Sequence, residues 1–335
     1  MNRNSLTALR RGTGLVVALA AVAAAAVGAT GAASHTAAKP KVAYLSFAVA
    51  NSYDAPMLKA ATAVVKKAGG SIAVFDANND PSKQLQQLQT VITSHQYNGI
   101  ILQPIYGPQL LTTVQQAIKA KIKLVNIDQI LGSNPGTAKP PLPGMSGNVV
   151  FVQTQIGRKQ GGLVVKACKK IKASPCKVGY MFSVKVSSLD TAIRKGFDAV
   201  TAGHNIQVVA EGQTFYNPAQ ALHDAQTMLQ GHPDINLIVG ADQAATGAEQ
   251  ALNGKKVTLV GYGGGAVGLK AVRAGRWFGT VMQRPLTEGK RGAQCLVRAI
   301  KKGKGCKGID VLAGLPDKGV VVKKNAKKFH AEWPG

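Results

Sequence analysis

The sequence predicts an α/β protein with mainly parallel sheets, long enough for two domains. Short apolar runs alternate with helical stretches of about 12 to 20 residues along most of the chain. Because parallel strands need crossover connections, this alternation favours parallel sheets with right-handed crossovers. Residues 132–147, rich in Gly and Pro, are either a loop between domains or a surface insertion. The strand-like runs cover residues 42–47, 72–75, 100–102, 124–127, 178–181, 208–211, 237–239, 258–262 and 279–282.

Residues 74–104 show the alternation most clearly. Asp80 and Pro81 mark a helix start, because a carboxylate can accept hydrogen bonds from the first free amides and proline needs no donor there. The apolar residues of the Gln-rich stretch that follows share one helical face, namely Leu85, Leu88, Val91 and Ile92. Residues 99–104 then have the pattern of a buried strand. The segment therefore predicts a strand, a capped helix and a second strand.

Residues 1–33 have the pattern of a cleaved signal peptide. Three Arg residues precede an Ala/Val-rich run over 14–27, and small residues at 31–33 provide a cleavage site. The run is shorter than the roughly 20 strongly apolar residues of a membrane span, so an uncleaved anchor is the less favoured alternative. No Cys lies near the cleavage site, so a lipid anchor is not predicted. We expect an extracytoplasmic protein, and removal of 33 from 335 residues leaves 302 for two domains.

The chain is strongly basic. Its formal net charge of +26 falls by three, to +23, when the three Arg of the leader are removed. This charge favours anionic partners such as nucleic acid, acidic envelope polymers, anionic lipid or an acidic ligand. The lysines, however, form scattered clusters, for example over 301–307 and 323–328, as on solvated faces. Without an RNA-binding aromatic motif or a helix-turn-helix, we expect no nucleic-acid partner.

The four cysteines form two close pairs. Cys168 lies near Cys176, and Cys295 lies near Cys306, each pair enclosing a Lys-rich turn. In an oxidising compartment such pairs favour two local disulfides that fix helix ends. Zinc binding or free thiols are the alternatives, but the pairs lack the two-residue spacing and the nearby His of structural zinc sites.

One motif supports an enzyme. Residues 263–268 match the glycine pattern of a dinucleotide-binding turn, and Glu288 lies at about the acidic position of that fingerprint. The match lies late in the chain in a poly-Gly stretch, so a flexible strand-to-helix turn is the other interpretation. The six His are scattered, and no nucleophile elbow, zinc-protease motif or phosphate loop is present. We therefore expect no enzyme, metal or cofactor, with a nucleotide-cofactor enzyme as the weaker alternative.

Motifs spread over about 270 residues resemble a known family. They are found over 42–45, 51–53, 76–81, 99–104, 127–128, 156–162, 194–197, 232–235, 240–243, 247–248, 260–262 and 281–283. In this order and spacing the chain resembles the ribose-type periplasmic sugar-binding proteins of ABC importers, which are type I periplasmic binding proteins.

The resemblance implies a fold, a function and partners. The fold has two Rossmann-like lobes joined by a three-strand hinge, with residues 40–152 and about 284–318 in the N-terminal lobe and 153–283 and about 319–335 in the C-terminal lobe. A small polar ligand, a sugar or sugar derivative, would be held between the closing lobes of a monomer and delivered to an ABC importer permease. An extracytoplasmic ligand sensor for signalling is the alternative.

The resemblance also implies ligand-binding residues. Aromatic rings would stack on a sugar ring while amides and carboxylates bond its hydroxyls. Asp128 and Asp242 have an alternative role as helix caps, and the tyrosines have one in ordinary packing. The implied residues are Phe47, Asn51, Tyr53, Asp54, Asp128, Gln129 and Gln283 on the first lobe's side, and Gln153, Thr191, Tyr216, Ala241, Asp242 and Tyr262 on the other.

Four of the positions depart from the ribose pattern. Gln129 and Thr191 stand where that pattern has Arg, Ala241 replaces a polar residue, and Gly263 replaces an acid. Fewer charged, multi-donor groups mean fewer strong hydrogen bonds to hydroxyls. The sequence therefore favours a deoxy, methylated or larger ligand over ribose.

Overall fold

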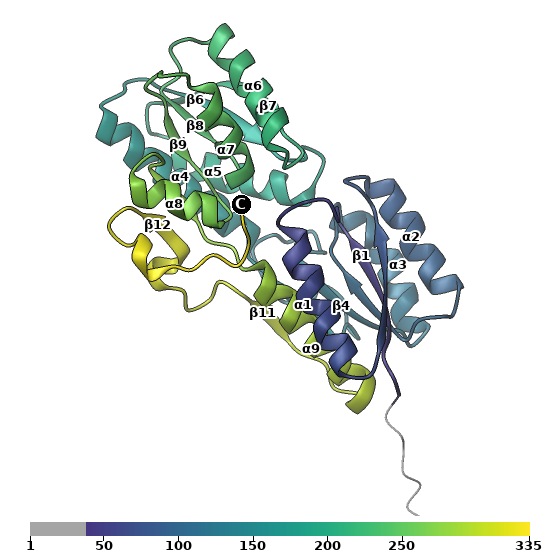
Figure 1. Cartoon of the computed structure of the whole chain (residues 1–335). Helices are drawn as coiled ribbons and strands as arrows, with labels where there is room; N and C mark the ends of the chain where they lie inside the picture. Colours follow the sequence, from purple (N-terminus) through teal and green to yellow (C-terminus); the bar gives the residue numbers. More distant parts are fainter. Residues whose placement is uncertain (1–37) are drawn as a thin grey trace, which may run out of the picture. The chain divides into compact units, whose positions relative to one another are not determined.

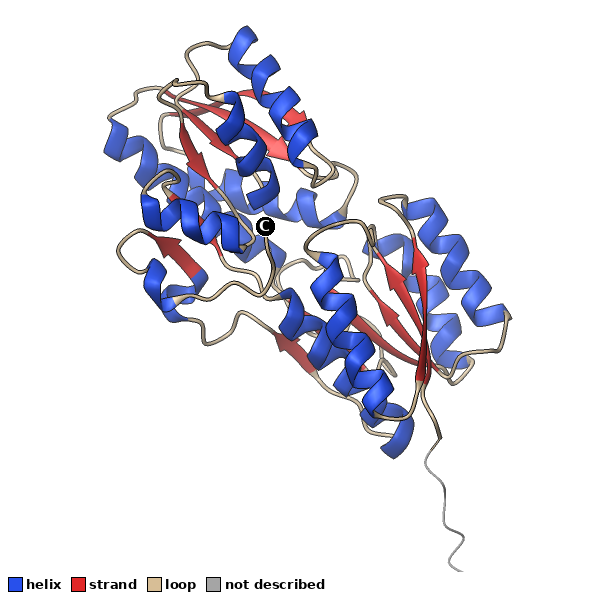
Figure 2. Cartoon of the chain, viewed as in Figure 1, coloured by secondary structure: helices blue, strands red, loops and turns tan. Residues whose placement is uncertain are grey.

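Two parallel-stranded sheets, each covered by helices, make up the part of the chain that the structure describes (Figure 2). The structure is a computed structural model, and it describes residues 38–335. The predicted signal peptide at 1–33 lies outside the described residues. Ala37–Gly335 form one compact unit that contains both sheets.

The first sheet is entirely parallel, in the order β11-β5-β4-β3-β1-β2. Helix α9 is far from α1 in the sequence, yet the two helices pack side by side (Figure 1). The strands are β1 (Lys41–Ser46), β2 (Ser71–Asp76), β3 (Gly99–Leu102), β4 (Lys123–Asp128), β5 (Gly147–Val150) and β11 (Gly308–Asp310). The helices are α1 (Asp54–Lys67), α2 (Pro81–Thr93), α3 (Gly107–Lys119) and α9 (Pro285–Lys302).

The second sheet has the order β12-β10-β9-β8-β6-β7, and only β12 is antiparallel to its neighbour. The strands are β6 (Cys176–Phe182), β7 (Ile206–Gln213), β8 (Leu237–Val239), β9 (Thr258–Val260), β10 (Gly279–Val281) and β12 (Val320–Val322). The helices are α4 (Gln153–Ile171), α5 (Ser188–Thr201), α6 (Pro218–Gly231), α7 (Asp242–Ala251) and α8 (Ala266–Ala274). Short 3₁₀ turns lie at Pro316–Gly319 and Ala326–Lys328.

The chain passes between the two sheets three times. It leaves the first sheet after β5, returns after β10 to form α9, and leaves again between β11 and β12. We call the two halves the first lobe and the second lobe, after their sheets. This is the predicted fold, although three short strands at these crossings, β5, β11 and β12, were missed because they adjoin Gly-, Pro- and Lys-rich segments that have the pattern of loops.

Local sequence signals act as predicted in α2. Asp80 Oδ1 accepts hydrogen bonds from the amides of Ser82, at 2.8 Å, and Lys83, at 3.1 Å, and Pro81 is the first helical residue. Leu88 and Val91 are buried on the sheet-facing side of the helix. The cap therefore fixes where the chain turns back after β2, and the apolar face fixes how the helix lies on the first sheet.

Both predicted disulfides are present. Cys168 in α4 is bonded to Cys176 at the start of β6, and Cys295 in α9 is bonded to Cys306 just before β11. Each bridge closes a short loop between a helix and the strand that follows it, far from the carboxyl ends of the sheets. Among the described residues, none of the helices combines the length and apolar character needed to cross a bilayer.

Helices α4 and α5 approach each other closely because glycines lie at their contact. A Cβ atom at Gly157 would overlap the backbone carbonyl of Ile193, and one at Gly196 would overlap that of Thr154. Gly162, in the same helix α4, has open space at its Cβ position. The two helices thus use glycine where their backbones touch, and this contact sets the position of α5 on the second lobe.

We predict that Gly157→Ala lowers the free energy of unfolding by about 1–3 kcal/mol, because the added methyl group meets backbone that cannot move aside. The matched change Gly162→Ala should be neutral or stabilising by up to about 1 kcal/mol through helix propensity. Urea unfolding of both variants checks this. Equal effects of the two changes would contradict the packing account.

Candidate functional site

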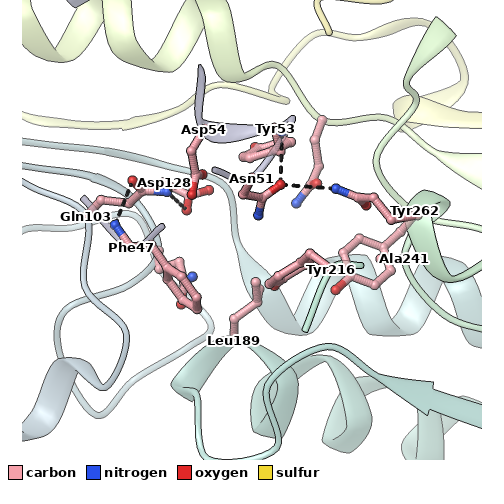
Figure 3. Close-up of a pocket in the computed structure, with 13 residues that line it drawn as sticks. Phe47, Asn51, Tyr53, Asp54, Gln103, Asp128, Leu189, Tyr216, Ala241 and Tyr262 are labelled. Atoms are coloured by element: carbon pink, nitrogen blue, oxygen red, sulfur yellow. Dashed lines mark hydrogen bonds between the residues drawn. The ribbon is translucent and has the colours of Figure 1, made fainter. Parts of the chain in front are cut away.

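A small cavity lies where the carboxyl ends of the two sheets face each other (Figure 3). The first lobe contributes side chains that follow β1, β3 and β4, and the second lobe contributes side chains that follow β7, β8 and β9. This is the position at which open α/β sheets bind small molecules. The lining residues are Phe47, Asn51, Tyr53, Asp54, Gln103, Asp128, Gln129, Leu189, Tyr216, Ala241, Gln243, Tyr262 and Gln283.

Three of the predicted site residues lie outside the lining. Gln153 begins α4 and is fully buried, with no hydrogen-bond partner for its side-chain oxygen or nitrogen. The Thr191 hydroxyl donates to the Ser187 carbonyl within α5. Asp242 begins α7 and accepts hydrogen bonds from Thr280 Oγ1, at 2.6 Å, and the Gly265 amide, at 2.9 Å. Its side chain therefore fixes the glycine turn at residues 263–265 and does not cap α7.

The same glycine turn has no open helix end for a dinucleotide. The free amides of Ala266 and Val267, at the start of α8, donate at 3.0 Å to the carbonyls of Trp333 and Pro334. The Trp333 indole also donates to the Gly263 carbonyl, at 2.9 Å. The C-terminal residues therefore occupy the helix N-terminus at which a pyrophosphate would bind. Gly263 and Gly264 have positive φ, so the turn needs glycine for its backbone alone.

Three lining residues were missed by the sequence analysis. Gln103 and Gln243 belong to motifs that carried the resemblance, and each directly follows or begins an element at a carboxyl strand end. That position is a usable signal for both amides. Leu189 lies in the first turn of α5 and carries no signal of its own, because a leucine there is expected in any helix.

Gln103 organises the first-lobe wall of the cavity. Its Nε2 donates to Asp54 Oδ1, at 2.7 Å, and to Asp128 Oδ2, at 3.0 Å, and its Oε1 accepts from the Phe47 amide at 3.2 Å. Gln84 in α2 donates to the Gln103 carbonyl, at 2.8 Å, and so holds the backbone of this segment in place. One amide side chain thereby joins the segments that follow β1, β3 and β4.

The carboxyl groups of this wall are buried without a cation. Burial raises the pKa of Asp128 to about 6, although Gln103, Tyr53 and Gln129 act to lower it. Burial first, and then the neighbouring Asp128, raise the pKa of Asp54 well above its usual range, and both causes act in the same order on Glu288. Glu288 lies behind the wall and accepts from the Tyr53 hydroxyl at 3.1 Å. The lining contains no Lys, Arg or His.

Aromatic rings form the opposite wall. Tyr216 meets Phe47 of the first lobe edge to face, with 6.0 Å between ring centroids. The Tyr262 hydroxyl lies 3.3 Å from Ser183 Oγ, so the ring is held with its face available to the cavity (Figure 3). This arrangement gives apolar ring surface on one side of the cavity and hydrogen-bond acceptors on the other.

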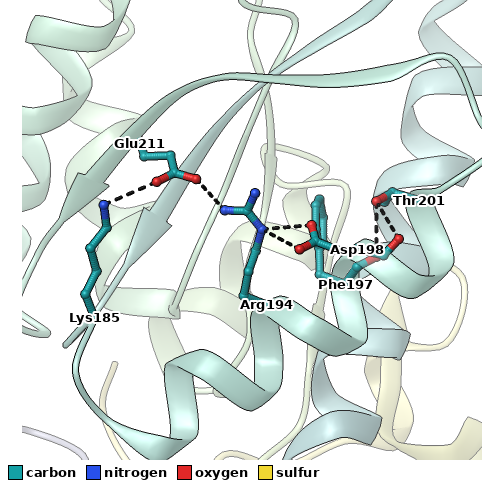
Figure 4. A network of polar contacts seen from close by, with 6 residues as sticks. All are labelled: Lys185, Arg194, Phe197, Asp198, Thr201 and Glu211. Carbon is teal, nitrogen blue, oxygen red and sulfur yellow. Dashed lines mark hydrogen bonds and ion pairs between the residues drawn. The ribbon is translucent and has the colours of Figure 1, made fainter.

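A polar network fixes α5 behind that wall (Figure 4). Glu211 in β7 accepts from Lys185 at 3.2 Å and from Arg194 in α5 at 2.5 Å, and Arg194 also pairs with Asp198 at 2.8 Å. The Arg194 guanidinium lies 4.8 Å from the centroid of Tyr180 in β6. These contacts tie α5, which carries Leu189, to the edge of the second sheet.

The lobes touch each other around the cavity. Gln243 Nε2 donates to Asn51 Oδ1 at 3.3 Å, and the Gly107 amide donates to Ser188 Oγ at 3.2 Å. The C-terminal carbonyl of Gly335 accepts from Ser52 at 3.1 Å. Each pair joins a first-lobe residue to a residue of the second lobe or the C-terminal segment. These contacts hold the two lobes against each other beside the cavity.

Sequence comparison identifies the family. The periplasmic binding protein domain matches residues 42–305. The chain belongs to this family. The D-allose-binding periplasmic protein of Escherichia coli (strain K12) is 30% identical over 267 residues, which are 76% of this chain and 83% of that protein. The ribose import binding protein of Bacillus subtilis (strain 168) is 25% identical over 228 residues, covering 67% and 70% of the two chains. The resemblance drawn from the motifs is confirmed.

Solved structures of family members share the fold. A solute-binding protein of Mycobacterium smegmatis with bound glycerol has a TM-score of 0.72 and 22% identity, covering 89% of this chain and all of that one. A myo-inositol-binding protein of Caulobacter has a TM-score of 0.72 and 20% identity, covering 87% and 96%. Members of this periplasmic binding protein family are binding proteins, not an enzyme class. In residues 38–335, no cluster of His, Cys, Asp and Glu side chains is arranged to hold a metal ion.

We predict that Asp128→Asn stabilises the empty protein more at pH 7.5 than at pH 4.5. The raised pKa means that folded Asp128 keeps its proton up to about pH 6, so its contribution to stability falls as pH rises through that value. Asn carries no charge at either pH. The stability difference between variant and parent should grow by about 2 kcal/mol over this interval.

Urea unfolding of refolded, ligand-free protein at the two pH values measures this difference. Asn suits the site because Asp128 has a φ of 66°, a region that Asn tolerates. Burial first, and then nearby charges that include Asp128, raise the pKa of Asp54, Glu288, Tyr44 and Tyr53, so the measured difference includes the relief of this repulsion in the variant. A difference that does not change with pH would contradict the buried, uncompensated charge.

Proposed function

We propose that this protein is an exported solute-binding protein of an ABC importer. It captures a small polar ligand, a sugar or sugar derivative, between its two lobes and delivers it to the membrane permease. The observation that carries this proposal is the cavity between the lobes, whose lining combines aromatic rings from both lobes with fixed amides and carboxylates. A sugar ring needs this combination, because one face is apolar and its rim is polar.

The export step and the division of the chain are part of the proposal. Residues 1–33 act as a cleaved signal peptide, and the mature protein works outside the cytoplasmic membrane as a monomer. The N-terminal lobe comprises residues 40–152 and about 284–318, and the C-terminal lobe comprises 153–283 and about 319–335. The names of the relatives, which import ribose or bind D-allose, support a sugar ligand.

The predicted site residues divide into contacts and supports. We propose as ligand contacts the ten that line the cavity, together with the newly found Gln103, Leu189 and Gln243. Thr191 and Asp242 bond to the surrounding backbone, and Gln153 is buried outside the lining. The ten are Phe47, Asn51, Tyr53, Asp54, Asp128, Gln129, Tyr216, Ala241, Tyr262 and Gln283.

Closure on a ligand is the experimental test of this function. Because the lobes must separate to admit a molecule, ligand binding should shift the protein from open to enclosed forms. Small-angle scattering with saturating D-allose, D-ribose or myo-inositol, each first screened for binding by calorimetry, should show a smaller radius of gyration for a binder. A binder that leaves the radius unchanged would contradict capture by closure.

We predict that Tyr216→Ala weakens binding of any such ligand by about tenfold or more, because it removes the ring face of one wall. Phe215→Ala is a matched control. Phe215 is the preceding residue, has nearly the same positive φ, and is 47% exposed outside the lining. Calorimetry should find wild-type affinity in the control. Equal losses in the two variants would assign the effect to the backbone of this turn and not to the ring.

A further inference from the structure

The charge of the cavity is opposite to the charge of the protein. The described residues carry a formal net charge of +23, since the +26 of the whole chain includes three Arg before residue 38. The cavity lining nevertheless contains two carboxyl groups, Asp54 and Asp128, and no cationic side chain. Glu288 adds a third buried carboxyl group directly behind Tyr53. An anionic molecule would be repelled by this arrangement, and a neutral sugar could bond the carboxyl groups but would leave their charge without a counter-charge.

Asp128 has an oxygen without a partner. Its Oδ2 accepts from Gln103, but its Oδ1 has no hydrogen-bond partner, and the side chain is only 3% exposed. The amide oxygen of Gln129, which also lines the cavity, is likewise buried and unpartnered. A buried acceptor without a donor costs free energy, and an ionised one costs more. The cavity therefore presents acceptors that a bound molecule has to satisfy.

The Gln103 amide cannot supply a donor to Asp128 Oδ1 or a positive charge. Its two N–H groups are already directed to Asp54 and Asp128, and an amide carries no charge. A ligand hydroxyl could donate one hydrogen bond to Asp128 Oδ1 but would leave the carboxylate charge uncompensated. An ammonium group donates three hydrogen bonds, accepts none and carries the opposite charge. An ammonium group would therefore supply both the missing hydrogen-bond donor and the missing positive charge.

The opposite wall also suits a cation. Phe47, Tyr216 and Tyr262 line the same cavity, and the face of an aromatic ring attracts a positive charge. A bare metal ion fits less well, because calcium needs six to eight oxygen ligands and two carboxyl groups here are already engaged by one amide.

We propose that the natural ligand is a polyhydroxylated molecule with a protonated amine, such as an amino sugar or an amino polyol, and that its ammonium group binds at Asp128. This inference rests on the proposed solute-binding function and specifies its ligand class. Gln129 and Asn51 lie beside this position in the lining and can bond the neighbouring hydroxyls. The pKa of Asp128, raised by burial to about 6, leaves the group ionised at neutral pH.

The test compares sugars that differ only in the amine. Calorimetry at pH 7.5 would measure binding of D-glucosamine, D-galactosamine and D-mannosamine against the parent hexoses and the N-acetyl derivatives. We expect at least one amine to bind about tenfold or more tightly than both of its neutral counterparts. Asp128→Asn should remove this preference. Asp198→Asn, which removes one charge from the outer face of the second lobe, should keep it.

The outcomes separate this inference from the proposed function. Neutral sugars that bind as tightly as the amines would overturn the inference and leave the proposed function standing. An amine preference that survives in Asp128→Asn would overturn the assignment to Asp128. Absence of binding across the whole panel would contradict both. The comparison within the wild-type protein is decisive even if the Asn variant does not fold.

Discussion

The candidate site depends on one side chain, the amide of Gln103. It connects two buried carboxyl groups, at 2.7 and 3.0 Å, and it also accepts from the amide of Phe47. Because Asp54 begins α1, Asp128 ends β4 and Phe47 follows β1, three elements of the first lobe meet at this one group. Without it, two like charges would face each other in a dry environment. Gln103 lowers the free-energy cost through its hydrogen bonds but carries no charge. The negative charge of the buried carboxyl groups is therefore left without a positive partner.

The acidic cavity contrasts with the basic surface of the protein. The lysines that give the chain its charge lie on exposed faces, where salt screens them within about 8 Å at physiological ionic strength. They do not compensate charges in an enclosed cavity, and they repel a cationic ligand during its approach. The basic surface and the acidic cavity therefore act at different stages. In the proposed function, the surface affects how often a ligand meets the protein, and Asp128, Asp54 and the aromatic side chains hold the bound ligand.

Much of the fold could be predicted from sequence, because it follows from local patterns. Asp80 and Pro81 start α2, apolar runs mark nine of the twelve strands, and two close cysteine pairs form the disulfides. The three missed strands are short and owe their existence to pairing with neighbours distant in sequence, as β11 pairs with β5. The segments beside them are rich in Gly, Pro and Lys, so these short apolar runs do not stand out from the loops that flank them.

Site residues that follow a strand could be predicted from the sequence, and residues whose role depends on distant partners could not. Phe47, Asp128, Tyr216 and Tyr262 lie at carboxyl strand ends and line the cavity. Asp242 begins a helix at such an end, but its partners are Thr280 and Gly265, far along the chain. In the same way, only the folded structure shows that Trp333 and Pro334 cover the glycine turn. Hydrogen bonds between distant segments have no local signature.

The most direct test of this account is mass spectrometry of the small molecule that is released when the protein, purified from its native source without added ligand, is unfolded. The account predicts about one molecule per protein chain, rich in hydroxyl groups and carrying a basic nitrogen that is protonated at neutral pH. A stoichiometric neutral or anionic molecule would contradict the central claim that the ligand compensates the buried charge of Asp128.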